Sequence, residues 1–217
     1  MPTALSPALQ IWGRANSVNV QKVLWCCREC DAGFTRTDAG MQYGRTTDSD
    51  YLAMNPNGRI PTLVDGDFVL WESNAIMRYI VLTHPDTSPA ALYPTQPRTR
   101  ARIERWLDWT LSTLQPIERP LFWGLVRTPP AERDLGAMQQ AADAAAVQWR
   151  IVDRQLATGD FIEGAGLSLA DVAIGTYARR WFGVEGVTRP ALPHLDRWFA
   201  LISARPGFQE FVAPPMS

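Results

Sequence analysis

The residues whose types and spacing suggest chemistry gather in one stretch, Asn55 to Ser73, NPNGRIPTLVDGDFVLWES. Pro61 has no N–H to donate, so it is predicted to begin a strand and to leave the Ile60 backbone outside the ladder. Glu72 and Ser73 precede an apolar-periodic run and predict a helix start, whose free amides favour an anion. These features suit a short peptide-like ligand bearing a carboxylate; the alternative is an ordinary hairpin with an ordinary cap.

A second candidate for chemistry is the C-x-x-C pair Cys27 and Cys30, which has the spacing of thiol redox sites. Redox pairs owe their low thiol pKa to a helix N-terminus. The helix predicted to start near Ser17 puts this pair about ten residues further on, where the helix field has gone. With only three cysteines in the chain, we interpret them as buried or incidental thiols, with a redox pair as the alternative.

The elements that position the first stretch follow from the periodicity of residues 1–84. Two strand patterns flank Asp65-Gly66-Asp67, which predicts a tight hairpin. The order β-α-β-α-β-β-α fits a thioredoxin-like domain with helices around a mixed four-stranded sheet. The predicted strands are 9–12, 34–37, 62–64 and 68–70, and the predicted helices begin near 17, 48 and 72.

The composition changes after residue 84. Residues 84–97 carry four prolines and cannot continue a helix, so we expect a linker over residues 85–97. Helical patterns then replace strand patterns. The predicted fold is therefore α+β, with a thioredoxin-like domain over 1–84 and an all-α domain over 98–217. The main predicted helices are 98–114, continued with a kink at Pro116 and Pro120 to 126, then 131–156, 193–204 and 208–212.

Ser168 and Asp171 have the spacing of a capping box, with Asp in place of the usual Glu or Gln. The alternative makes Asp171 a buried catalytic carboxylate. We favour the capping role, because a carboxylate that accepts from free helix amides already explains the position.

The pattern NP-x-G-x-(I/V)-P-x-L, a short hairpin and then E-S-x-A-I-x-x-Y-(I/L) resembles the glutathione-binding half of the glutathione S-transferase superfamily. The resemblance is to bacterial, serine-type, theta- or beta-like enzymes and covers nearly the whole chain. It implies that Pro61 is cis and that Ile60 pairs with the cysteinyl backbone of glutathione. It also implies that Glu72 and Ser73 hold the γ-glutamyl end.

The resemblance further implies a catalytic residue. An enzyme that uses glutathione as co-substrate must form a thiolate from a thiol with an intrinsic pKa of about 8.5. A hydrogen-bond donor aimed at sulfur and a helix N-terminus both favour the thiolate. Ser17 supplies both, and serine-type members carry their serine two residues before the position of Asn19. Asn19 is expected to bind glutathione, and Asn16 or Asn19 is the alternative to Ser17; Ser17 as a simple helix cap is a further alternative.

A second substrate site is expected between the domains, as in the family. Arg14, beside Ser17, is a candidate to face an acidic or halogenated substrate, and its alternative is a solvated loop arginine. The aromatic candidates are Phe122, Trp123, Trp181 and Phe182, whose helical spacing is also typical of core residues.

We therefore expect a glutathione transferase that attacks small electrophiles, often hydrophobic or halogenated, by alkyl or aryl transfer to the glutathione sulfur. Dehalogenation, isomerisation and peroxide reduction are related outcomes. The family implies a homodimer and a role in detoxification. The alternative is a non-catalytic, transferase-like protein that binds glutathione or a protein partner for regulation.

Composition excludes other classes. A net charge of −1 and a pI near 6.1 give no electrostatic argument for nucleic acid. No secretion signal or bilayer-length apolar run occurs, so we expect a cytoplasmic protein without membrane contact. No metal-binding motif occurs, and no metal is expected.

Overall fold

The structure is a computed structural model that describes residues 9–217. The chain divides into two compact units, with the boundary between Pro89 and Ala90. This boundary falls within the segment predicted to be a linker.

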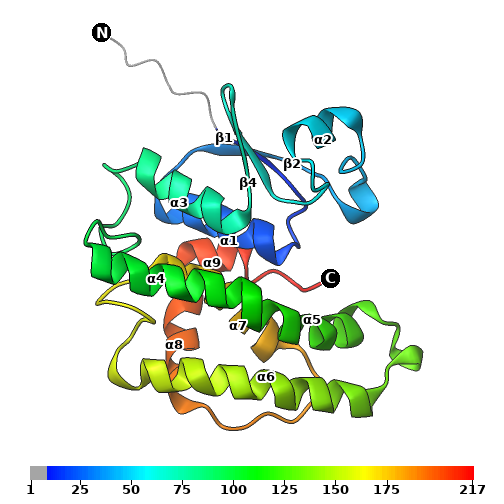
Figure 1. The fold of residues 1–217 in the computed structure, drawn as a ribbon. Helices are drawn as coiled ribbons and strands as arrows, with labels where there is room; N and C mark the ends of the chain where they lie inside the picture. Colours follow the sequence, from blue (N-terminus) through cyan, green and yellow to red (C-terminus); the bar gives the residue numbers. More distant parts are fainter. Residues whose placement is uncertain (1–8) are drawn as a thin grey trace. The chain divides into compact units, whose positions relative to one another are not determined.

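The N-terminal unit is built on a four-stranded sheet in the order β2-β1-β3-β4 (Figure 1). Strand β1 pairs with β2 in parallel and with β3 antiparallel, and β3 pairs with β4 antiparallel. The mixed sheet predicted from the element order is confirmed. The elements are β1 (Leu9–Trp12), α1 (Val18–Glu29), β2 (Phe34–Thr37), η1 (Met41–Tyr43), α2 (Ser49–Met54), β3 (Thr62–Asp65), β4 (Phe68–Trp71) and α3 (Ser73–Thr83).

The β3–β4 hairpin follows from its turn chemistry. Asp65 pairs with Phe68, so Gly66 and Asp67 form a two-residue turn. Gly66 has φ +61°, a conformation that glycine adopts without the strain a side chain would bring. The tight turn fixes the register of both strands.

Helices α1 and α3 pack against each other (Figure 1). Val20, Val23 and Leu24 of α1 are buried on the predicted face. Cys26, Cys27 and Cys30 are also fully buried and form no disulfide. Burial raises the pKa of the Cys27 thiol, whereas a hydrogen bond with Cys26 lowers the pKa of Cys30. The complete burial of both side chains supports the buried-thiol interpretation over a redox pair, which needs an accessible thiolate.

The C-terminal unit is helical. Its longest helical segment runs from Pro97 to Arg127. One π-helical stretch lies before Pro116 and a second lies after Pro120. A proline lacks the N–H for a regular i→i−4 bond, and a wider turn next to it is one way to continue the helix. The elements are α4 (Pro97–Trp109), η2 (Thr110–Leu114), α5 (Gln115–Phe122), η3 (Trp123–Arg127), η4 (Pro130–Glu132), α6 (Leu135–Gln155), η5 (Leu156–Thr158), α7 (Leu169–Gly183), α8 (Pro193–Ser203) and α9 (Pro206–Phe211).

Helix α6 begins later than predicted. The alanine-rich pattern predicts a start at residue 131, but the helix starts at Leu135. Asp134 occupies the N-cap, and its carboxylate accepts from Ala137 N at 2.9 Å. The prediction overlooks this cap, because the alanines and Glu132 favour a helix on propensity alone.

The core of the C-terminal unit surrounds α7. Trp149, Tyr177, Trp181 and Trp198 are almost fully buried. The capping box at the start of α7 is confirmed, since Asp171 accepts from the Ser168 amide at 2.9 Å. Asp171 also accepts from Ile162 N and from the indole of Trp198, each at 2.8 Å, so the carboxylate joins three segments.

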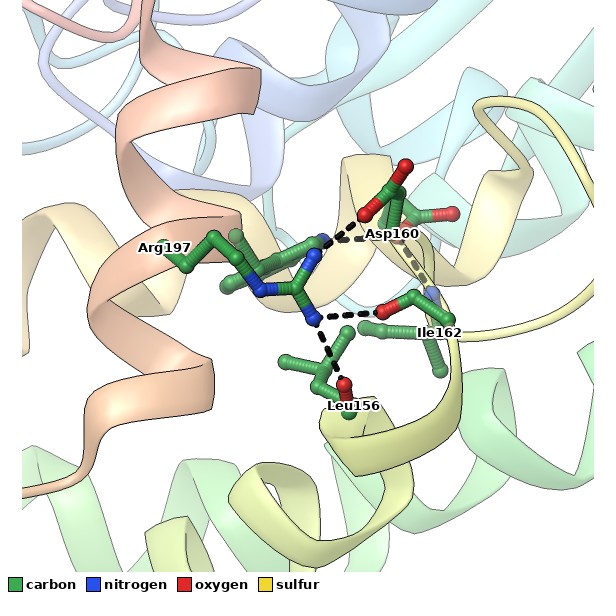
Figure 2. A network of polar contacts seen from close by, with 7 residues as sticks. Leu156, Asp160, Ile162 and Arg197 are labelled. Carbon is green, nitrogen blue, oxygen red and sulfur yellow. Dashed lines mark hydrogen bonds and ion pairs between the residues drawn. The ribbon is translucent and has the colours of Figure 1, made fainter.

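Arg197 of α8 binds the backbone at the C-terminal end of α6 and in η5, which directly follows α6 (Figure 2). Its Nη2 donates to the carbonyls of Leu156 and Gly159, each at 2.8 Å, and its guanidinium also pairs with Asp160. A cation here satisfies carbonyls that the helix end leaves without partners.

Within residues 9–217, no helix combines the length and the apolar character needed to cross a membrane.

Candidate active site

The sheet register brings the three predicted site segments to one end of the N-terminal unit. Trp12, the last residue of β1, pairs with Thr62, and Thr62 pairs in turn with Trp71, the last residue of β4. The loop after Trp12 leads to Ser17, and Ile60–Pro61 immediately precede Thr62. The helix start at Glu72 directly follows Trp71. Residues that are far apart in sequence are therefore neighbours at this end of the strands, which we call the site edge.

Gly13 allows the loop before Ser17 to approach the proline loop closely. It has φ +152°, and a Cβ there would lie 2.5 Å from Val20 Cγ2 and 3.2 Å from Ile60 Cβ. A side chain at Gly13 would therefore displace Val20 of α1 and crowd Ile60. Glycine at this position lets the backbone pass close to both residues.

Ser17 is the N-cap residue of α1 and is buried. Its carbonyl accepts from Val20 N and Gln21 N at 2.9 and 2.8 Å. Its side chain, however, makes no capping bond to the first turn, all of which lies in the described part of the chain. The hydroxyl is therefore not used as a cap, and the helix dipole adds a favourable field for an anion beside it.

The Ile60–Pro61 peptide bond is cis, as the resemblance implied. Two side chains hold the loop that precedes it. The Tyr51 hydroxyl donates to Arg59 O at 2.7 Å, and Asn55 Nδ2 donates to the same carbonyl at 2.8 Å. Both side chains also contact the Thr62 hydroxyl, at 2.9 and 3.0 Å. The backbone on both sides of the proline is thus fixed by buried polar groups.

Glu72 and Ser73 begin α3. Glu72 is the exposed N-cap residue, with φ +72°, and its carboxylate makes no bond to the first turn within the described structure. Ser73 is buried, and its hydroxyl donates to Asn19 Oδ1 at 3.4 Å. The structure therefore brings Asn19 and Ser73 together, and leaves the Glu72 carboxylate open to a cationic group.

Sequence reasoning missed several residues that support this edge. Arg36 Nη1 donates to Gly13 O at 2.8 Å and pairs with Asp38, which holds the loop before Ser17. Lys22 Nζ donates to Asn74 Oδ1 at 2.7 Å, and burial lowers the pKa of Lys22 to about 7. The sequence signal that could have identified Lys22 was a single lysine within the apolar pattern of a helix.

The second-site candidates are placed differently. Trp181 is only 1% exposed and packs on Trp149 with ring centroids 5.9 Å apart, which fits the core alternative. Phe122 is 4% exposed and lies under the Arg180 guanidinium at 3.8 Å. Trp123 is 44% exposed. In the N-terminal unit, Arg14 is half-buried, and its guanidinium lies against Gly40.

Comparisons with known proteins bear on this site. A family model described as the glutathione S-transferase N-terminal domain matches residues 7–81, and the C-terminal domain of that family matches residues 114–206. The chain is 37% identical to glutathione S-transferase GstB of Escherichia coli K12, covering 96% of this chain and all of that protein. It is 32% identical to glutathione S-transferase 3 of Zea mays, covering 94% and 93% of the two chains.

A solved structure also resembles the protein. It is the theta class glutathione S-transferase of Xanthomonas axonopodis pv. citri with glutathione bound, which is 41% identical with a TM-score of 0.90. The match covers 97% of this chain and all of that one.

The fold and the site together define a two-unit enzyme with a thioredoxin-like sheet and a helical second unit. A serine at a helix start, a cis-proline loop and a second helix start share one edge of that sheet. The chain belongs to the glutathione S-transferase family, and its activity is that of a transferase.

Proposed function

We propose that the protein binds glutathione at the edge formed by Ser17, Ile60–Pro61 and Glu72–Ser73, and activates its thiol for attack on small electrophiles. The observation that carries this proposal is the register Trp12–Thr62–Trp71, because it gathers these three segments. The glutathione-bound structure of the Xanthomonas relative supports the choice of ligand.

Each segment has a distinct role in the proposal. The Ser17 hydroxyl donates to the glutathione sulfur, and the N-terminus of α1 adds its field, so that the thiolate is favoured. The Ile60 backbone pairs with the cysteinyl unit. The γ-glutamyl carboxylate binds at the start of α3 beside Ser73, and its ammonium binds the Glu72 carboxylate. Asn19 supports this end through its contact with Ser73.

The chemical step is nucleophilic substitution or addition. The thiolate sulfur gives an electron pair to an electrophilic carbon, and a carbon–sulfur bond forms. In substitution, the leaving group departs with the electron pair of its bond. In addition, the electron pair of the bond that opens moves to the neighbouring atom, which then takes a proton from water. Arg14, in the loop before Ser17, stays a candidate to contact the electrophile. The exposed Trp123 stays a separate candidate in the C-terminal unit. Phe122 and Trp181, which are buried, are better explained as core residues.

The domain division at 1–84, 85–97 and 98–217, a homodimeric state and a cytoplasmic location remain part of this proposal. The family resemblance supports the dimer, and size-exclusion chromatography with light scattering tests it.

The decisive experiment is an ultraviolet difference titration of glutathione bound to the purified protein. We expect thiolate absorbance to appear with a pKa well below the free value of about 8.5. Binding without a pKa shift would favour the non-catalytic alternative. Absence of binding would overturn the proposal.

A further inference from the structure

The chain contains a single lysine, Lys22, and that lysine is fully buried. It lies in α1, one turn after Asn19, and its Nζ donates to Asn74 Oδ1 at 2.7 Å. Asn74 is itself only 3% exposed and is the second residue of α3. The proposed chemistry does not use either side chain.

A buried ammonium is a poor way to fill space. Removing its charge from water is unfavourable, and an apolar side chain of similar size often gives equal or greater stability. The charged neighbours that act on Lys22 are Glu72, which favours the ammonium, and Arg78, which disfavours it. The position is therefore better explained by what Lys22 holds in place than by stability.

The contacts of Lys22 belong to a row that joins the two helices. Asn19 contacts Ser73, and Lys22 contacts Asn74, so two successive residues of α3 are bonded to two residues on one face of α1. Cys26 extends the row by a turn, with its Sγ 3.7 Å from Met77 O. The bonds nearest the site fix the first turn of α3.

Resting on the proposed function, we propose that Lys22 is a positioning residue for glutathione. It holds Asn74, and through it the first turn of α3, so that Glu72 and Ser73 stay aligned with the start of α1. Its effect falls on the γ-glutamyl end of glutathione, which the start of α3 binds. It does not act on the sulfur.

The test is the Lys22→Met variant, which keeps a long side chain without a donor. We expect its Kd for glutathione, measured by calorimetry, to rise about tenfold because the recognition groups lose their alignment. The pKa of the bound thiol and kcat at saturating glutathione should stay near the wild-type values. A merely structural defect would instead lower the number of active sites and leave the Kd of the folded fraction unchanged.

Cysteinylglycine, which lacks the γ-glutamyl residue, sharpens the test. Lys22→Met and the wild type should bind it equally, because the end that Lys22 aligns is missing. An equal loss for both ligands would overturn the inference. Cys26→Ala is the matched control: it removes the last contact of the same row and should leave glutathione binding unchanged.

A double variant guards against misfolding of the single one. Lys22→Leu with Asn74→Leu removes both members of this hydrogen bond together, so that neither side chain is left buried without the other. It should show the same loss of glutathione affinity, and an unchanged Kd in either folded variant would overturn the inference alone. Failure of the wild type to bind glutathione would overturn the proposed function as well, so the two failures are distinguishable.

Discussion

The hydroxyl of Ser73 donates to Asn19 Oδ1 at 3.4 Å and joins two helix starts that lie 54 residues apart in sequence. The bond links the element that carries Ser17 to the element that carries Glu72. In the proposed complex, Ser17 binds the sulfur of glutathione and Glu72 binds its γ-glutamyl ammonium. The bond thereby holds these two protein groups at a fixed separation. Alignment of this kind reduces the ordering that a ligand must supply on binding.

The Ser17→Ala variant tests the proposed thiolate donor. Without the hydroxyl, the bound thiol pKa should move back towards about 8.5, and kcat near neutral pH should fall about 10²-fold. Glutathione affinity should be largely intact, because Ile60, Glu72 and Ser73 remain. The measurements are the difference titration and steady-state kinetics. Unchanged turnover would remove Ser17 from the mechanism and move attention to Asn16 and Asn19.

Lys22 should make stability depend on pH in a definite direction. Burial lowers its pKa in the folded protein to about 7, from an ordinary value of 10.5. Between these values the unfolded chain binds more protons, so stability rises with pH. The wild type should gain on the order of a few kcal/mol relative to Lys22→Met between about pH 7 and 10. Urea unfolding of both proteins measures the difference, and a flat difference would contradict the burial effect.

Glu118 should make stability depend on pH in the direction opposite to that of Lys22. Burial raises its pKa from 4.5 to about 7, although Trp149, Arg180 and Arg189 oppose the shift. The folded protein then binds more protons between these values, so stability falls as pH rises through the window and stays lower above it.

The Glu118→Gln variant removes this titration and keeps an oxygen to accept from the Trp149 indole, which lies 2.7 Å from Glu118 Oε1. From low pH to above pH 7, the stability of the variant relative to the wild type should increase by about 3 kcal/mol. Denaturant unfolding across the window provides the measurement. If the difference does not change with pH, the carboxyl is not titrating there.

Asp171 is expected to stabilise the fold without taking part in the reaction. Its buried carboxylate accepts from Ile162 N, from the amide and hydroxyl of Ser168 and from the Trp198 indole. Asp171→Ala leaves these donors without their acceptor and should lower the free energy of unfolding by about 3 kcal/mol or more.

The activity of the Asp171→Ala protein that remains folded should be normal, as active-site titration with kinetics would show. Asp160→Ala is the control, because the Asp160 side chain is 70% exposed in its pair with Arg197 and should contribute less than about 1 kcal/mol. A loss of kcat in the folded Asp171 variant would revive the catalytic alternative.

Local signals accounted for much of the fold. The hairpin at Gly66–Asp67 and the capping box of Ser168 and Asp171 depend on residues within a few positions of each other, and both were predicted correctly. The strands were also predicted from local alternation and turn residues: β1 and β2 have their predicted bounds, whereas β3 and β4 each end one residue later than predicted. The start of α6 was missed because helix propensity competed with the Asp134 cap.

Local signals could not predict the contacts between residues that are far apart in sequence. Lys22 and Asn74 lie 52 residues apart, and the apolar period of α1 gives no indication of where a polar member of the helix finds its partner. The sequence could not decide whether Trp181 is buried against Trp149 or lines a substrate site, because helical spacing identifies a face but not what packs on it. The site segments were identified by their motif, whereas their meeting at one edge depends on the pairing of Trp12, Thr62 and Trp71.

The burial of the one lysine also has a practical consequence for labelling. Reagents that acylate lysine amines need solvent access, which the folded protein denies to Lys22. Opening of α1 away from α3 would expose that amine. Acylation of a single side chain, followed by mass spectrometry, would therefore report how often this pair of helices separates, with no background from other lysines.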